Sequence, residues 1–210
     1  FELRELIGRS QRTMAWLACD PRVGQELVIV MPREQPLDPD AAANWEHRAR
    51  KAARLDHPNL AHPVEIGLQE RWPFVAYDAD GAQTLGSRIG SDGLPARDAA
   101  DMTAQVARGL AFAHEAGMVH GDVQPYLVRV ADNGVVRLMG LEVALGAAGD
   151  LLPGTDTAAP ADALTEAERR RVQRAAARRD VLTLGFVLHL ALSGQAALDV
   201  VQVRADRAAA

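Results

Sequence analysis

The sequence predicts an α+β fold of two lobes, the first an antiparallel sheet with one helix and the second mainly helical. Short apolar segments separated by turn residues fill the first 80 residues. From Leu94 onward the apolar residues recur with helical spacing instead. We therefore assign residues 1–80 to the first lobe and 81–210 to the second. With 210 residues, of which 48% are hydrophobic, the chain is long enough to bury a sizeable core.

The first lobe is predicted to be a small meander. Its strand signals are short segments bounded by turn residues, among them Asp20, Pro21 and Gly24. A helix is predicted after the third strand, with Asp40 as its N-terminal cap and its end at about Leu55. The strands are expected over residues 1–8, 15–19, 26–31, 64–69 and 73–78.

The second lobe begins with a predicted amphipathic helix. Pro95 suits the first turn of this helix, and Gly117 suits a left-handed residue at its end. A loop over 120–125 then leads to two short strands, expected over 127–130 and 135–139 and joined by a tight turn. The apolar stripe of the helix consists of Met102, Val106, Leu110 and Ala113.

Two further features are predicted after these strands. The segment 145–163 is rich in Gly, Ala, Pro and Asp and is expected to be mobile. Thr165 and Glu168 then form a capping box that opens an arginine-rich helix, whose residues 169–179 are expected to be a solvated face or a docking surface. A second helix is expected over 180–193 and is predicted to be buried, because it is apolar on several sides.

Composition excludes several classes of function. The formal net charge of -5 argues against a nucleic-acid binder. The single cysteine, Cys19, cannot form an internal disulfide, which favours a cytoplasmic protein. The longest apolar run, residues 181–192, is interrupted and too short to span a membrane. The chain begins at Phe1, as expected for a piece of a longer protein, and its arginine-rich composition with Lys51 as the one lysine is typical of bacteria with GC-rich genomes.

Four segments occur in an order that resembles the protein-kinase fold, particularly bacterial serine/threonine kinases. Residues 55–60 are similar to the L-x-H-P-N stretch of that family, and residues 110–120 resemble the approach to its catalytic loop. Residues 120–125 (HGDVQP) are similar to the loop motif H-R-D-L-K-P, and residues 180–185 (DVLTLG) resemble D-x-x-S-L-G at the start of the central helix. The resemblance implies a two-lobed kinase-like fold whose second lobe is truncated or incomplete.

The resemblance also implies positions for ATP, and most of them have changed. The glycine loop of the family requires three glycines so that its backbone can approach phosphates, and here only the first remains. The strand lysine corresponds to Val30, or to Met31 one residue later, and its partner glutamate to Arg48. The two walls around adenine correspond to Val28 and Arg129, a bulkier and a charged residue, so ATP binding is not expected. The positions of the glycine loop are Gly8, Ser10 and Thr13.

The metal ligands of the family are likewise absent from the matching positions. Its asparagine corresponds to Leu127, and its D-F-G triplet to Gly140, Leu141 and Glu142. Because magnesium prefers oxygen ligands, neither a metal nor any other cofactor is expected. We expect Glu142 to be an ordinary exposed acid. Asp122 is retained at the position of the catalytic base, and we interpret it as a residue that braces its loop by accepting backbone hydrogen bonds.

Other retained positions are expected to have structural roles. The arginine that meets an activation-loop phosphate in many family members is replaced by Gly121, so no phosphorylation switch is expected at Thr155 or Thr157. The structural positions are His120, Leu141 and Asp180.

These observations predict that the chain is not an enzyme but a catalytically inactive, kinase-like (pseudokinase) signalling module. The expected partner is another protein or a covalently attached output domain, and the overall style of the sequence resembles the kinase-like region that precedes HDOD domains in some bacterial proteins. One alternative is a weak or unconventional ATP-dependent serine/threonine kinase or other phosphotransferase. Another is a purely structural spacer.

Overall fold

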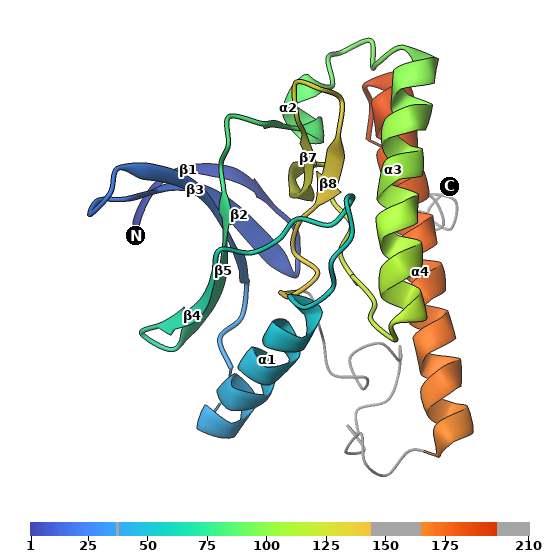
Figure 1. The fold of residues 1–210 in the computed structure, drawn as a ribbon. Coiled ribbons are helices and arrows are strands. Elements are labelled where there is room, and N and C mark those ends of the chain that lie inside the picture. The colour runs from blue at the N-terminus through green and yellow to red at the C-terminus, as the bar shows by residue number, and fades with distance from the viewer. Residues whose placement is uncertain (37, 144–164, 197–210) are drawn as a thin grey trace, which may run out of the picture.

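The computed structural model describes residues 1–36, 38–143 and 165–196, and it confirms the predicted α+β, two-lobed architecture (Figure 1). The first lobe is a five-stranded sheet in the order β1-β2-β3-β5-β4, and every neighbouring pair is antiparallel. Strand β2 pairs with β3 without a break in register, whereas β1 pairs with β2 through two irregularities. The strands are β1 (Glu2–Arg9), β2 (Thr13–Asp20), β3 (Gln25–Pro32), β4 (Glu65–Gln69) and β5 (Trp72–Asp78).

Helix α1 (Pro39–Ala52) lies beside this sheet and is capped by a different residue from the one predicted. Asp38 has an extended backbone, and its side chain accepts a 2.7 Å hydrogen bond from the backbone N–H of Ala41. Asp40 lies inside the first turn instead, where its charge still favours the positive end of the helix dipole. The predicted cap was therefore two residues too late.

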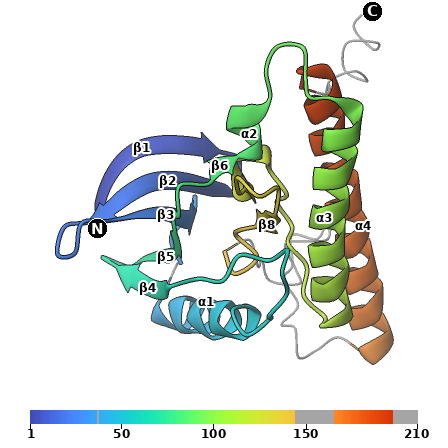
Figure 2. The same cartoon turned by 45° about the horizontal axis from the view of Figure 1, so that its top comes forward.

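The second lobe combines a three-stranded sheet with helices (Figure 2). The sheet order is β6-β7-β8, and the sheet lies between the first lobe and helix α3. Helix α3 is followed by Gly117 in a left-handed conformation, as predicted. The elements are β6 (Gln83–Thr84), α2 (Leu85–Arg88), α3 (Ala96–Glu115), the 3₁₀ helix η1 (Pro125–Leu127), β7 (Val128–Val130), β8 (Val136–Leu138) and α4 (Glu166–Ser193).

Helix α4 is one continuous helix, so the prediction of two separate helices was wrong. Its N-terminus has the predicted capping box between Thr165 and Glu168, and it ends at Gly194 in a left-handed conformation. Residues 169–180 contain neither glycine nor proline and include three consecutive alanines, so nothing in this stretch interrupts the helix. The continuous helix runs beside α3 in both views (Figures 1 and 2).

One main apolar core includes buried residues from both lobes. It contains Val28 and Val30 from the sheet of the first lobe, and Leu127 and Leu141 from the second. A smaller cluster, in which Phe74 meets Phe1 edge-on, occupies another part of the first lobe. The division at residue 80 therefore stays a prediction, because the core continues across it.

Two predictions concern the remaining parts of the chain. The segment 145–163, with Thr155 and Thr157, lies outside the described residues. No helix in the described ranges is long and apolar enough to cross a membrane.

Candidate functional site

Asp122 lies at the junction of the two lobes and is almost completely buried. Its Oδ2 atom accepts hydrogen bonds of 2.6 Å from Ser10 Oγ and of 2.6 Å from Thr13 Oγ1. Its Oδ1 atom accepts a 2.9 Å hydrogen bond from Gln124 Nε2. The sequence predicts that this carboxylate accepts backbone hydrogen bonds, whereas in the structure two of its donors are the side chains of Ser10, in the β1–β2 turn, and of Thr13, the first residue of β2. Asp122 therefore links the lobes.

The end of β1 and the start of β2 pack directly on Tyr126. A Cβ atom added to Gly8 would lie 2.4 Å from Tyr126 Cγ, closer than any real contact of this kind. The Tyr126 hydroxyl lies 2.9 Å from Thr13 Oγ1, and burial raises the pKa of this tyrosine. The one glycine retained from the predicted phosphate loop thus makes room for an aromatic ring of the same chain. Sequence reasoning missed Tyr126, because nothing in its local sequence indicates a contact with residue 8.

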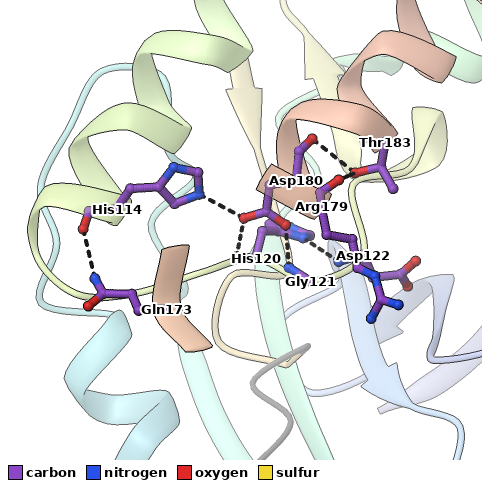
Figure 3. Close-up of polar contacts among 8 residues, drawn as sticks. All are labelled: His114, His120, Gly121, Asp122, Gln173, Arg179, Asp180 and Thr183. Carbon is purple, nitrogen blue, oxygen red and sulfur yellow. Dashed lines mark hydrogen bonds and ion pairs between the residues drawn. The ribbon is translucent and has the colours of Figure 1, made fainter. Parts of the chain in front are cut away.

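Asp180 organises the segment that precedes Asp122 (Figure 3). The Asp180 carboxylate accepts hydrogen bonds from the backbone N–H groups of His120, at 2.8 Å, and Gly121, at 2.7 Å. Its Oδ2 atom also lies 2.8 Å from Nε2 of His114 on α3. Burial by itself would raise the pKa of Asp180, but the hydrogen bonds from His114 and from these amides outweigh it and lower the pKa. Helix α4 is thereby attached to both α3 and the loop.

His120 is fully buried, and both nitrogens of its ring have hydrogen-bond partners. Its Nδ1 atom accepts a 3.2 Å hydrogen bond from the backbone N–H of Asp122, and its Nε2 atom lies 2.8 Å from the carbonyl oxygen of Met139. Because a carbonyl can only accept, Nε2 carries a proton. The ring therefore joins the loop to the segment that follows β8, and both nitrogens are used in these contacts.

Glu142 is buried rather than exposed, so the expectation of an ordinary surface acid was wrong. The Tyr77 hydroxyl donates a hydrogen bond to the Glu142 carboxylate and accepts one of 2.9 Å from the backbone N–H of Gly140. Burial raises the pKa of Glu142 to about 7, although the hydrogen bond from Tyr77 lowers it. Burial and the nearby carboxylate raise the pKa of Tyr77. The exposure prediction failed because an acid after an apolar pair gives no sign of a tyrosine 65 residues away.

Arg129 occupies the position that the resemblance assigns to one wall of the adenine site. Its guanidinium donates hydrogen bonds to the backbone carbonyls of Asp78 and Ala79, at the end of β5, and to the carboxylate of Asp80. The side chain is buried, and this burial lowers the pKa of the guanidinium. The sequence predicts a charged residue at this wall, but only the fold shows which groups the guanidinium bonds.

The positions that the resemblance assigns to the strand lysine, an adenine wall and the metal ligands are buried apolar residues or glycine. Val28 and Val30 are buried on β3, opposite Tyr77 and Val75 of β5. Leu127 is fully buried, and Cδ1 of Leu127 would lie 3.3 Å from a Cβ atom added to Gly140. In the described part of the chain, no group of three or more His, Cys, Asp or Glu residues could hold a metal ion.

Leu141 and Arg48 are the other two positions that the resemblance singles out, and they lie in different lobes. Leu141 is buried in the main core, and Arg48 is half-buried on α1. The structure therefore brings Ser10, Thr13 and Asp122 together by direct contacts and places Arg129 at the end of β5. In this arrangement the Arg129 guanidinium is bonded to the backbone carbonyls at the end of β5.

Known proteins similar to this chain are protein kinases. Serine/threonine-protein kinase PknB from Mycolicibacterium smegmatis is 27% identical over 203 residues, covering 93% of this chain and 32% of that protein. Serine/threonine-protein kinase PknA from Mycobacterium tuberculosis is 29% identical over 211 residues, covering 93% of this chain and 47% of that protein. The chain thus spans a third to a half of the length of these curated relatives. No family model matches the chain.

Solved structures agree on the fold. The PknI kinase domain of Mycobacterium tuberculosis matches with a TM-score of 0.64 at 18% identity, covering 94% of this chain and 75% of that one. Rad53 residues 1–466, solved in complex with AMP-PNP, match with a TM-score of 0.65 at 12% identity, covering 94% and 49%. The prediction that this chain is not an enzyme is contradicted by the curated relatives, because they are named serine/threonine kinases and point to an enzyme family.

Proposed function

We propose that this chain, a member of the protein-kinase-like superfamily, acts in signalling by binding another protein or an attached domain, and that its own side chains close its interlobe cleft. The observation that carries the proposal is the position of Arg129, whose guanidinium is bonded to the carbonyls of Asp78 and Ala79. An adenine ring against the same carbonyls would have to displace a buried cation from its acceptors. A buried guanidinium left without these acceptors would cost more than the about 1–3 kcal/mol of a neutral unpaired group, because it is charged.

A second closure supports the same proposal on the other side of the cleft. Ser10 and Thr13 occupy positions that the resemblance assigns to the glycine loop, and both donate to Asp122. The β1–β2 turn is therefore held against the loop, with Tyr126 packed against Gly8. Opening this side would break two hydrogen bonds to a buried carboxylate.

The lengths of the relatives support a partner within the same polypeptide. In PknB and PknA the matched region makes up 32% and 47% of the protein, so most of each protein lies outside it. An attached output domain is one form of the proposed partner. The HDOD type of this domain, and the cytoplasmic location expected from the single cysteine, stay predictions.

A second candidate function is ATP-dependent serine/threonine phosphotransfer. It is favoured by the names of the curated relatives and by Asp122, which keeps a carboxylate at the position of the catalytic base. This function requires that the contacts of Arg129 and of Asp122 open before a nucleotide enters. The two candidates therefore differ in how the folded chain responds to ATP and magnesium.

A nucleotide titration distinguishes the two candidates. We would measure the melting temperature of the chain with increasing Mg-ATP, together with transfer of labelled phosphate from ATP to casein. For a closed cleft we expect no shift for the wild type and a saturable rise for Arg129→Leu, which removes the guanidinium from the carbonyls of Asp78 and Ala79. Arg137→Leu is the matched control, because Arg137 is exposed on β8 and pairs with Arg129 across the sheet.

Either of two results would overturn the closed cleft. A saturable Mg-ATP shift in the wild type, accompanied by labelled casein, establishes the phosphotransferase instead. A shift that appears equally in Arg129→Leu and Arg137→Leu shows that the guanidinium is not the obstacle.

A further inference from the structure

The first half of α4 presents three arginines on one side of the helix. Arg171, Arg174 and Arg178 are exposed and follow one another at intervals of three and four residues, which places them in one row. With Ala175 they line a hollow of about 550 Å³. The first turns of α4 extend past the C-terminal end of α3 in both views (Figures 1 and 2). We call these three residues the arginine row.

Packing on the opposite side fixes the direction in which the row faces. Val172, Ala176 and Asp180 are buried, and they follow one another at intervals of four residues. Gln173 Nε2 also donates a 3.2 Å hydrogen bond to the carbonyl oxygen of His114, at the end of α3. The helix therefore cannot turn its arginines inward without exposing an apolar stripe and a buried carboxylate.

The row has no internal counter-charge among the residues that the structure describes. An ion pair within this helix, between Arg170 and Glu166 at 2.8 Å, lies at its first turns. No described carboxylate forms an ion pair with Arg171, Arg174 or Arg178. In a chain with a formal net charge of -5, this is a local concentration of positive charge.

We propose that the arginine row binds an acidic segment of a partner protein in an extended conformation. This inference rests on the proposed function, and it names the binding surface and the chemistry of the partner. The row rises about 10 Å along the helix axis. Carboxylates on one side of an extended chain recur about every 7 Å, a spacing that long arginine side chains can match. Guanidinium groups also bind carboxylates with two parallel hydrogen bonds, which lysine cannot do.

Two other anionic partners fit the surface less well. A helix that binds a membrane surface needs an exposed apolar face alongside its basic one. On the half of α4 that carries the row, Val172 and Ala176 are buried, and the exposed apolar residues Val181, Leu182 and Phe186 lie beyond the row. A nucleic acid needs a basic surface extended over many phosphates, whereas this row has three arginines on an acidic chain.

Fluorescence anisotropy with a labelled peptide of alternating Glu and Ser tests the proposal. The proteins compared are the wild type, the row variant Arg171→Gln/Arg174→Gln/Arg178→Gln, and a charge-matched control. The control, Arg54→Gln/Arg97→Gln/Arg108→Gln, removes three exposed arginines that lie outside α4. We expect the row variant to lose about tenfold in affinity, and the control to stay close to the wild type. Melting temperatures of all three proteins check that each is folded.

Several outcomes would contradict the proposal that the arginine row binds an acidic segment. These are peptide binding that the row variant retains, an equal loss in the control, and row-dependent binding of anionic lipid vesicles or of polyuridine RNA in place of the peptide. The test is independent of the nucleotide titration. Binding of Mg-ATP by the wild type would contradict the proposed closed cleft but not peptide binding by the arginine row. Unchanged peptide binding by the row variant would contradict the role of the row but not the closed cleft.

Discussion

Thr13 Oγ1 donates a 2.6 Å hydrogen bond to Oδ2 of Asp122, across 109 residues of sequence and across the junction of the two lobes. Ser10 donates to the same oxygen. Asp122, at the position of the catalytic base, thus accepts hydrogen bonds from two residues at positions that the resemblance assigns to the glycine loop.

Removing both hydroxyls is expected to destabilise the folded chain. In Ser10→Ala/Thr13→Ala the buried Asp122 carboxylate keeps only Gln124 as a side-chain donor, at a cost of about 1–3 kcal/mol. Urea unfolding measures the change in the free energy of unfolding. Thr103→Ala is the control, because the Thr103 hydroxyl bonds a carbonyl of its own helix. A loss no greater than that of the control would mean that these hydroxyls do not hold the lobes together.

Glu142 is expected to make stability depend on pH near neutrality. Its pKa is raised in the fold from 4.5 to about 7, so its contribution is fully present below the unfolded value and is lost as the pH rises through about 7. The loss is at most about 3 kcal/mol. Urea unfolding at a series of pH values should show this decline in the wild type and not in Glu142→Gln.

Two further observations separate Glu142 from other groups. The hydrogen bond from Tyr77 lowers the Glu142 pKa, so Tyr77→Phe should move the decline to higher pH. Asp180 acts in the opposite direction, because its pKa is lowered and its contribution is lost as the pH falls below 3.8. A decline of equal size and position in Glu142→Gln would assign the effect to another group.

Asp180→Asn is expected to loosen α4 from the loop that contains Asp122. The N–H groups of His120 and Gly121 bond different oxygens of the Asp180 carboxylate, so in an asparagine one of them would face the NH₂ group, which is itself a donor. The expected loss is about 3 kcal/mol, measured by chemical unfolding. Asp92→Asn, at an exposed turn, is the matched control. Equal losses for the two variants would contradict the role of Asp180.

Gly8→Ala is expected to be destabilising even though a small residue is added. Its Cβ atom would overlap the ring of Tyr126, at a cost of about 1–3 kcal/mol. Gly90→Ala is the control, since a Cβ atom there has open space. If the overlap is the cause, then in the double variant with Tyr126→Ala the glycine substitution should cost much less. An unchanged melting temperature for Gly8→Ala would contradict the overlap with Tyr126 and would favour the role of the family glycine, which lets the backbone approach phosphates.

The sequence by itself determined the fold class, the strands of the first lobe, the left-handed Gly117 that follows α3 and the capping box of α4. These features depend on periodicity and turn residues, whose effects act over a few neighbouring residues. Where two caps or two helix starts compete locally, as at Asp38 and Asp40, the periodicity does not separate them. The continuity of α4 through Asp180 was missed for the same reason.

Only the tertiary structure decided what each site residue contacts. The hydrogen bond between Tyr77 and Glu142 joins residues that are tens of positions apart. The same is true of the hydrogen bonds from Arg129 to the carbonyls of Asp78 and Ala79. The residue types at these positions could be compared with a family one by one, but the chain carries no local signal of which groups meet. Packing of the two lobes brings them together, because each buried charge or donor must find a partner once water is excluded.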